Sequence, residues 1–111
     1  MIPLNICGNT YIIPDGYSVE PITLVSYIIV GNHKIYVNSL YRVTKYEDIG
    51  GVEIEKMMFD DIYLFEYGGH SHVFIRRVLD GGKIIRKHFH IPCYSDKEVD
   101  LGKIFKSLHV E

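Results

Sequence analysis

The sequence contains no alanine, no glutamine and no tryptophan. Without alanine, the chain lacks the residue with the highest helix propensity. It is rich instead in β-branched and aromatic residues, because isoleucine occurs 16 times, valine 10 times and tyrosine 9 times among 111 residues. Such side chains favour a pleated, half-buried surface. The composition therefore predicts a protein made mainly of β-strands.

Cysteines and long apolar segments are also scarce. Cys7 and Cys93 are too few for a disulfide scaffold and form no CxxC pair, so we expect two reduced, buried thiols. No basic segment followed by an apolar one opens the chain, which argues against a signal peptide. The apolar runs are much shorter than the ~20 residues that span a bilayer. These absences predict a soluble, cytoplasmic protein with no membrane partner.

The length of the chain indicates one domain, and the two halves of this domain differ in charge. The 111 residues contain no linker or low-complexity segment, so residues 1–111 are expected to form a single domain. Residues 1–67 hold 4 Lys/Arg and 9 Asp/Glu, whereas residues 68–109 hold 8 Lys/Arg, 4 Asp/Glu and five of the six histidines. An anionic partner such as RNA is therefore expected to bind the C-terminal half.

Short β-rich segments separated by turn residues predict a series of antiparallel hairpins. Residues 52–61 are ambiguous, because their apolar positions fit both an alternating strand and one stripe of a helix. The Met, Glu and Lys content favours a short helix there. The expected strands lie at residues 24–30, 34–37, 40–46 and 62–67, and short apolar runs lie at residues 2–6 and 10–13.

The clearest hairpin runs from His70 to Ile91 around Asp80-Gly81-Gly82. A three-residue loop pairs residue i with residue 162−i and gathers the apolar positions on one face, whereas a two-residue loop would split them. The apolar face then holds Val73, Ile75, Leu79, Ile85, Phe89 and Ile91. The opposite face holds His70, His72, Arg76, Arg86, His88 and His90, with Phe74, Val78 and Ile84 among them.

A helix is expected to follow Pro92. Ser95-Asp96-Lys97-Glu98 has the capping-box pattern, with Ser95 as the N-cap. The apolar stripe of this helix comprises Leu101, Ile104, Phe105 and Leu108. The predicted fold class is therefore α+β: mainly antiparallel hairpins, closed by a C-terminal amphipathic helix.

The histidine face of the hairpin is the candidate site. Four imidazoles at i, i+2 spacing on paired strands fit a transition-metal site, acid–base chemistry on a phosphodiester, or a solvated surface with no chemistry. No cysteine or carboxylate shares that face, so no metal and no other cofactor is predicted. In the second interpretation Arg76 and Arg86 would hold the phosphate.

The C-terminal half resembles the HicA family of small mRNA-interferase toxins. The resemblance covers residues 52–109 and depends on Gly69-His70-Ser71-His72, the following hairpin, Ile91-Pro92 and the lead-in to the last helix. It implies an α-β-β-β-α fold like that of a double-stranded-RNA-binding domain, with helices at 52–62 and 96–109. It also implies that His72 is the catalytic histidine, that cleavage needs no metal, and that an antitoxin is the partner. The swapped order of His70 and Ser71 and the unmatched residues 1–50 depart from the family pattern.

Two functions follow from these features. The first is RNA binding through Arg76, Arg86, His88, His90 and His70, with metal-independent cleavage by His72. The second is a non-enzymatic accessory protein, viral or archaeal, that binds a host protein or a second copy of itself through a sheet edge or surface patch. An AT-rich genome of that kind would also explain the Ile, Tyr and Lys content.

Overall fold

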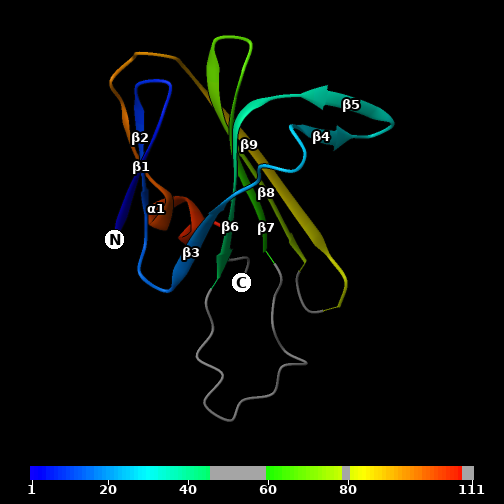
Figure 1. The fold of residues 1–111 in the computed structure, drawn as a ribbon. Helices are drawn as coiled ribbons and strands as arrows, with labels where there is room; N and C mark the ends of the chain where they lie inside the picture. Colours follow the sequence, from blue (N-terminus) through cyan, green and yellow to red (C-terminus); the bar gives the residue numbers. More distant parts are fainter. Residues whose placement is uncertain (46–59, 79–80, 109–111) are drawn as a thin grey trace.

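The computed structural model describes residues 1–45, 60–78 and 81–108 (Figure 1). Strands make up 65% of these residues, and one short helix is present among them. The described chain is essentially all-β, so the predicted α+β class is wrong. Its elements are β1 Ile2–Ile6, β2 Asn9–Ile13, β3 Tyr17–Pro21, β4 Tyr27–Val30, β5 His33–Tyr36, β6 Asn38–Lys45, β7 Asp60–Tyr67, β8 His70–Val78, β9 Ile84–Pro92, β10 Glu98–Asp100 and α1 Leu101–Lys106.

A five-stranded antiparallel sheet forms the centre of the molecule, in the order β3-β6-β7-β8-β9. The register predicted for the β8–β9 hairpin is confirmed, because His72 pairs with His90 and Val73 pairs with Phe89. Val73 and Ile75 are fully buried, while Phe89 and Ile91 are half-buried. Leu79 and Asp80 lie outside the described residues. Alternation of apolar and polar side chains thus set the pairing of these two strands.

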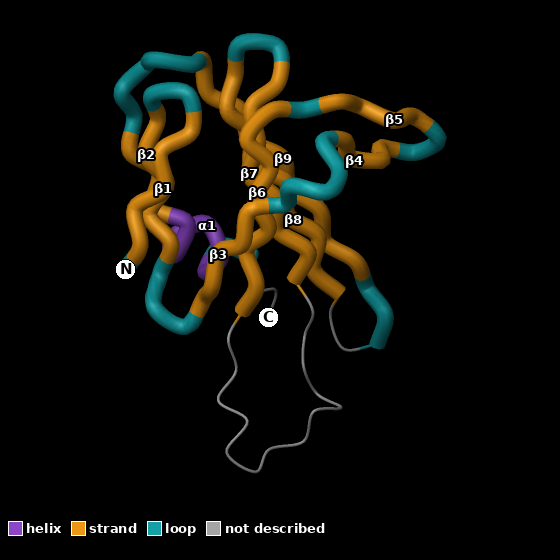
Figure 2. Tube along the Cα trace, in the orientation of Figure 1, coloured by secondary structure: helices purple, strands orange, loops and turns teal. Residues whose placement is uncertain are grey.

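One face of the central sheet carries the main hydrophobic core. A second sheet, in the order β1-β2-β10, and helix α1 cover this face (Figure 2). The strands supply alternate residues to the core, as a two-layer arrangement requires. Its fully buried members include Ile6, Tyr11, Ile13, Val43, Ile62, Leu64, Val73, Ile75 and Leu101.

The opposite face of the central sheet is only partly covered. The β4–β5 hairpin, which we call the arm, projects to one side of the sheet in Figure 2. Together with the residues beside it, the arm encloses a smaller apolar cluster on this face. The cluster contains Val37, Leu40 and Phe65, with Ile28, Ile35, Tyr63 and Phe74 packed against it. No other described element covers the rest of this face, which we call the open face, and the histidines lie there.

The C-terminal helix begins later than predicted, and Ser95 is not its N-cap. Asp96 has a φ of 56°, a left-handed conformation that does not continue into a right-handed helix. Residues 98–100 instead form β10, which pairs in parallel with β2. Asp100 is the actual N-cap, and its side chain accepts hydrogen bonds from the N–H groups of Gly102 and Lys103. Long-range strand pairing therefore overrode a local capping signal.

Other expectations fall partly outside the described chain. The short helix expected at residues 52–61 lies outside the described residues, apart from residues 60 and 61, which begin β7. The predicted helix at 96–109 is reduced to Leu101–Lys106. Its apolar stripe was nevertheless assigned correctly, because Leu101, Phe105 and Leu108 are buried in the main core. No helix among the described residues has the length and apolar character needed to cross a membrane.

Candidate functional site

Four histidines meet on the open face of the β8–β9 hairpin. His70 and His72 come from β8, and His88 and His90 come from β9. The centroids of neighbouring imidazole rings lie 5.2–6.2 Å apart. We call these four residues the histidine cluster. The predicted register brings all four together, whereas their chemical roles remain predictions.

Tight turns fix the position of the β8 histidines. β7 and β8 are joined by Gly68-Gly69, whose φ values of 60° and 76° are both positive, as in a type I′ turn. This two-residue turn places Tyr67 opposite His70 and Phe65 opposite His72. The Nδ1 of His70 lies 3.1 Å from the carbonyl oxygen of Gly68, so Nδ1 donates and Nε2 has no partner among the described residues.

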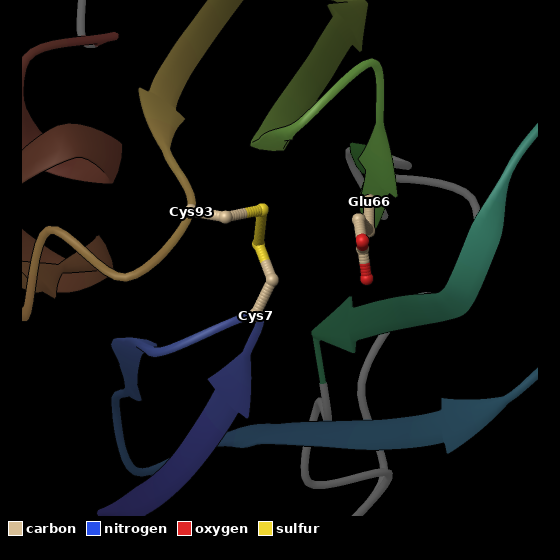
Figure 3. A group of neighbouring side chains, drawn as sticks. All are labelled: Cys7, Glu66 and Cys93. Carbon is tan, nitrogen blue, oxygen red and sulfur yellow. A yellow bond between two sulfur atoms is a disulfide. The ribbon is translucent and has the colours of Figure 1, made fainter.

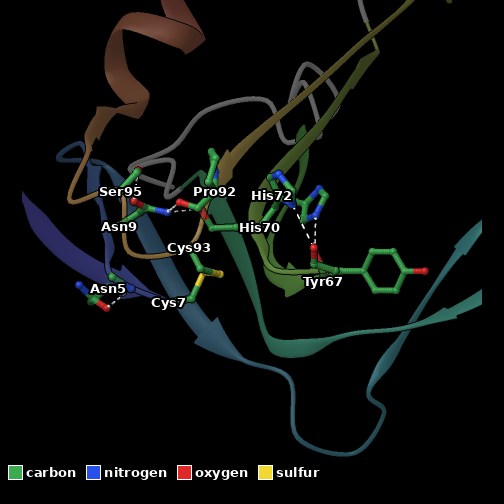
Figure 4. Close-up of a disulfide and its surroundings, with 12 residues drawn as sticks. Asn5, Cys7, Asn9, Tyr67, His70, His72, Pro92, Cys93 and Ser95 are labelled. Carbon is green, nitrogen blue, oxygen red and sulfur yellow. Dashed lines mark hydrogen bonds between the residues drawn. A yellow bond between two sulfur atoms is a disulfide. The ribbon is translucent and has the colours of Figure 1, made fainter.

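Hydrogen bonds define the protonation of the His72–His88 pair. His72 Nε2 lies 2.9 Å from the carbonyl oxygen of Tyr67, which only accepts, so His72 Nε2 is the donor (Figure 4). In a neutral His72 ring, Nδ1 then carries no proton and accepts from His88 Nε2 at 2.9 Å. His88 is therefore protonated on Nε2 as well. Its Nδ1 retains a free lone pair, with no partner among the described residues.

The surroundings keep this pair neutral. The Phe65 ring stacks on His72 with centroids 5.0 Å apart and planes 6° apart. Burial lowers the pKa of His72; repulsion from the other three histidines lowers it further, while the bond to the Tyr67 carbonyl opposes the shift. Burial and then repulsion from His90 also lower the pKa of His88. Both rings are consequently uncharged near pH 7 and available to accept a proton.

The arginines lie on the same face but farther along the hairpin. Arg76 and Arg86 face each other across β8 and β9. Arg76 is four positions beyond His72, which corresponds to about 13 Å along a strand. Arg76 forms an ion pair with Asp61 at 3.1 Å, whereas Arg86 is exposed. Arg77 lies on the buried face and donates to the carbonyl oxygen of Phe105.

Metal ligands gather at a different place. Among the described residues, the three ligand atoms that lie close enough together to hold one ion come from Cys7, Glu66 and Cys93. The histidine nitrogens form no such group of three in this part of the chain. Within the histidine cluster, His72 and His88 are joined instead by a hydrogen bond.

A buried polar network lies behind the hairpin and was not predicted. Asn9 is fully buried, and its amide nitrogen donates to Ser71 Oγ at 3.1 Å and to the Pro92 carbonyl oxygen at 2.9 Å (Figure 4). The Asn9 carbonyl oxygen accepts from Ser95 Oγ at 2.6 Å. Tyr11 and Ser71 are also hydrogen-bonded through their hydroxyl groups, and burial raises the pKa of Tyr11. This network connects β2, β8 and the segment after β9.

The cysteines are joined beside this network, so the prediction of two reduced thiols is wrong. Cys7 and Cys93 form a disulfide with their Cα atoms 5.0 Å apart. They are 86 residues apart in the sequence, and no spacing motif connects them. Only the folded topology reveals that the β1–β2 turn and the end of β9 meet.

An apolar cavity lies under the arm. Its volume is about 360 Å³, and residues of the arm and of the open face of the central sheet line it. The residues that line it from the sheet are Leu40, Tyr63, Phe65 and Phe74. Phe65 therefore contacts this cavity region and also stacks on His72.

Comparison of the chain with protein-family models, with curated proteins and with solved structures finds no match.

Proposed function

We propose that this protein binds RNA through the open face of the β8–β9 hairpin and cleaves it without a metal. The observation that carries the proposal is the neutral, hydrogen-bonded His72–His88 pair on an accessible face. General acid–base groups work best when their pKa lies near the working pH and they contact the substrate, and a histidine that is neutral near pH 7 can serve as a base. His88 is the more exposed member of the pair, and its free Nδ1 is the atom that meets the substrate.

The chemistry uses the 2′-hydroxyl of RNA as the nucleophile. His88 Nδ1 accepts the hydroxyl proton while His88 Nε2 passes its own proton to His72 Nδ1. The Tyr67 carbonyl, which is already bonded to His72 Nε2, stabilises the resulting imidazolium. His90 donates a proton to the departing 5′-oxygen. Its ring centroid lies 5.9 Å from the ring centroids of both His72 and His88. The phosphorus–oxygen bond to the 2′-oxygen forms as the bond to the 5′-oxygen breaks.

Residues around the histidine cluster suit a single-stranded ligand. Tyr67 is 48% exposed at the edge of the cluster and offers an aromatic surface for a base. Arg86 is exposed, and Arg76 retains N–H donors beyond the one that contacts Asp61. Such contacts would hold the backbone phosphates without selecting a sequence.

The resemblance to the HicA family supports the same proposal. In that interpretation β7, β8 and β9 are the three consecutive antiparallel strands of the family, and His72 is its catalytic histidine. Our proposal differs in assigning the contact with the substrate to His88 and a proton-relay role to His72. A cognate antitoxin would then be the expected protein partner.

A cleavage assay on labelled single-stranded RNA in the presence of EDTA tests this proposal. His88→Ala and His72→Ala should each reduce the rate by about 10²–10⁴-fold, the usual contribution of a general acid or base. Because the two rings act as one unit, the double variant should be no slower than either single variant. His33→Ala, which alters an exposed histidine on the arm, is the control. Wild-type cleavage that EDTA abolishes, or no cleavage at all, would refute the catalytic part.

The arm favours a second function, as an interaction protein. Leu24 is 98% exposed, Ile29 is 69% exposed and Tyr36 is 65% exposed, so apolar side chains gather on and beside the arm. We take a second copy of the chain as the partner that covers these apolar side chains, because the purified protein alone is enough to test self-association. Sedimentation should then show a dimer that Ile29→Lys dissociates.

A further inference from the structure

Three potential metal ligands converge at the disulfide. The sulfur atoms of Cys7 and Cys93 and one carboxylate oxygen of Glu66 all lie within 4.8 Å of one another (Figure 3). All three residues are half-buried. They come from the β1–β2 turn, the end of β7 and the residue after β9. The site is therefore built by three segments that are distant in the sequence.

Contacts other than the disulfide hold these segments together. The N–H of Tyr94 donates to the Cys7 carbonyl oxygen at 2.6 Å, and the N–H of Cys93 donates to the Gly69 carbonyl oxygen at 2.9 Å. The buried Asn9 network ties the same segments a few residues away. None of these contacts uses the sulfur–sulfur bond, so we expect them to keep the two cysteines close in a reduced protein that stays folded.

The Glu66 carboxylate has no hydrogen bond or ion pair with any of the described residues. Its oxygens are not among the buried polar atoms that lack a partner, so water reaches them, and the disulfide beside it supplies neither a cation nor a hydrogen-bond donor. A divalent cation between the carboxylate and two thiolates would satisfy all three groups.

We propose that reduction of the disulfide converts this place into a Zn²⁺ site. A reductant such as a phosphine, which becomes the phosphine oxide with oxygen from water, supplies two electrons. The sulfur–sulfur bond breaks, two protons from water complete the two thiols, and Zn²⁺ then displaces the two thiol protons. The ligands are the thiolates of Cys7 and Cys93 and the carboxylate of Glu66, with water in the fourth position. Zinc binding at this place is independent of the proposed RNA chemistry.

The dimensions suit zinc. Zn–S bonds of about 2.3 Å and Zn–O bonds of about 2.0–2.2 Å in a tetrahedral site place the two sulfur atoms about 3.8 Å apart. After reduction the two sulfur atoms therefore move apart to about 3.8 Å. This distance is still shorter than the 4.8 Å within which the three ligand atoms now lie. Thiolates select zinc over the hard cations Mg²⁺ and Ca²⁺. In the oxidised protein the sulfur atoms carry no charge, so the redox state controls metal binding.

Zinc titration of oxidised and reduced protein tests the proposal. A water-soluble phosphine reduces the disulfide and becomes the phosphine oxide with oxygen from water. The phosphine is then removed. Zn²⁺ is added in the presence of a chromogenic chelator, which competes with the protein for the metal and reports the free zinc. The reduced protein should gain one zinc equivalent that the oxidised protein lacks. The oxidised protein is a matched control, because its histidine cluster is the same.

Variants identify the ligands. Cys7→Ser and Cys93→Ser should each weaken reduction-dependent binding by about 100-fold or more, and Glu66→Gln by about 10-fold. His90→Ala should leave it unchanged. Co²⁺ in place of Zn²⁺ should give a thiolate charge-transfer band in the near ultraviolet, which a histidine site does not produce.

Far-UV circular dichroism completes the test if reduction unfolds the chain. Refolding on addition of Zn²⁺ would support the site, because metal binding then supplies folding free energy. Three results would overturn the proposal: equal zinc binding by both redox forms, binding that survives Cys7→Ser, or a reduced chain that stays unfolded in zinc.

Discussion

At the residue scale, Gly8 combines two constraints at the β1–β2 turn. Its φ of 87° lies in the left-handed region, which L side chains rarely adopt. A Cβ atom at this position would lie 2.8 Å from the Cα of Tyr94. Gly16 has a nearly identical φ of 90°, yet a Cβ atom added there would meet nothing within 4 Å. Substitution at Gly16 therefore incurs only the energy cost of the left-handed backbone, whereas substitution at Gly8 also incurs the cost of steric overlap with Tyr94.

Alanine substitutions at these two glycines test the close contact between the turns. Gly16→Ala should lower the free energy of unfolding by about 1–2 kcal/mol, the cost of a left-handed non-glycine residue. Gly8→Ala should lower it clearly more, because the backbone of Tyr94 must also move. Urea denaturation of both variants measures the difference. Equal losses would contradict the contact between Gly8 and Tyr94.

The sequence predicted which histidines share a face, but not how their rings are bonded. The register places His72 opposite His90, yet the hydrogen bond of His72 runs diagonally to His88. Diagonal neighbours across paired strands are within reach of long or aromatic side chains, and only side-chain packing decides between them. The sequence does contain the signal for the stacking of Phe65 on His72. The two-residue Gly68-Gly69 turn fixes the register of β7 and β8, which pairs these two residues.

At the element scale, local patterns predicted the strands of the β4–β5 and β8–β9 hairpins, but they missed β3 and placed the start of the helix too early. The β8–β9 and β4–β5 hairpins follow from alternation and turn residues, both of which lie close together in the sequence. β10 depends on a parallel partner about 90 residues away, which no local pattern reveals. The capping box at Ser95 was consequently misinterpreted, although the apolar stripe from Leu101 onward was recognised.

Substitutions at Ser95 and Asp100 distinguish the two possible helix starts. Asp100→Asn should change the stability by only a few tenths of a kcal/mol, because Asn is an equally good N-cap. Ser95→Asp should cost about 1 kcal/mol or more, because a carboxylate would replace the hydroxyl that donates to Asn9. Urea denaturation gives both values. A neutral Ser95→Asp and a destabilising Asp100→Asn would instead favour a helix capped at Ser95.

At the scale of the whole molecule, the stability should depend on pH through the histidine cluster. The folded state holds the pKa values of His72 and His88 below their ordinary value, so the unfolded chain takes up protons first. The stability contributed by the neutral rings is present above about pH 6.5 and is lost as the pH falls through the lower, folded values. The urea midpoint should therefore decrease between pH 7.5 and pH 5.5.

A matched pair of variants assigns this pH dependence. His88→Gln keeps an N–H donor for His72 but does not titrate, so the decrease in the urea midpoint should become smaller. His33→Gln, on the arm, should leave the decrease as it is in the wild-type protein. The assignment to the histidine cluster would be wrong if both variants behaved alike.

The covalent and polar connections between distant segments were beyond sequence analysis for a related reason. Cys7 and Cys93, like Asn9 and Ser95, are 86 positions apart in the sequence and lie together in the folded structure. Neither the composition nor the spacing of residues in the sequence predicts a contact between segments so far apart. The described chain is thus closed by contacts between its first strands and the segment that follows β9.

The central claim is that the open face of the β8–β9 hairpin binds RNA, and a fluorescence-anisotropy titration with a short labelled single strand tests it most directly. The affinity of the wild-type protein for RNA should fall as the salt concentration rises. Arg76→Ala combined with Arg86→Ala should make the slope of log K against log salt shallower by about 1.4, because each lost phosphate contact changes the slope by about 0.7. Lys103→Ala combined with Lys106→Ala removes the same charge from helix α1 and should keep the wild-type slope. Flat anisotropy at low salt, or an equal loss of affinity in both double variants, would contradict the claim.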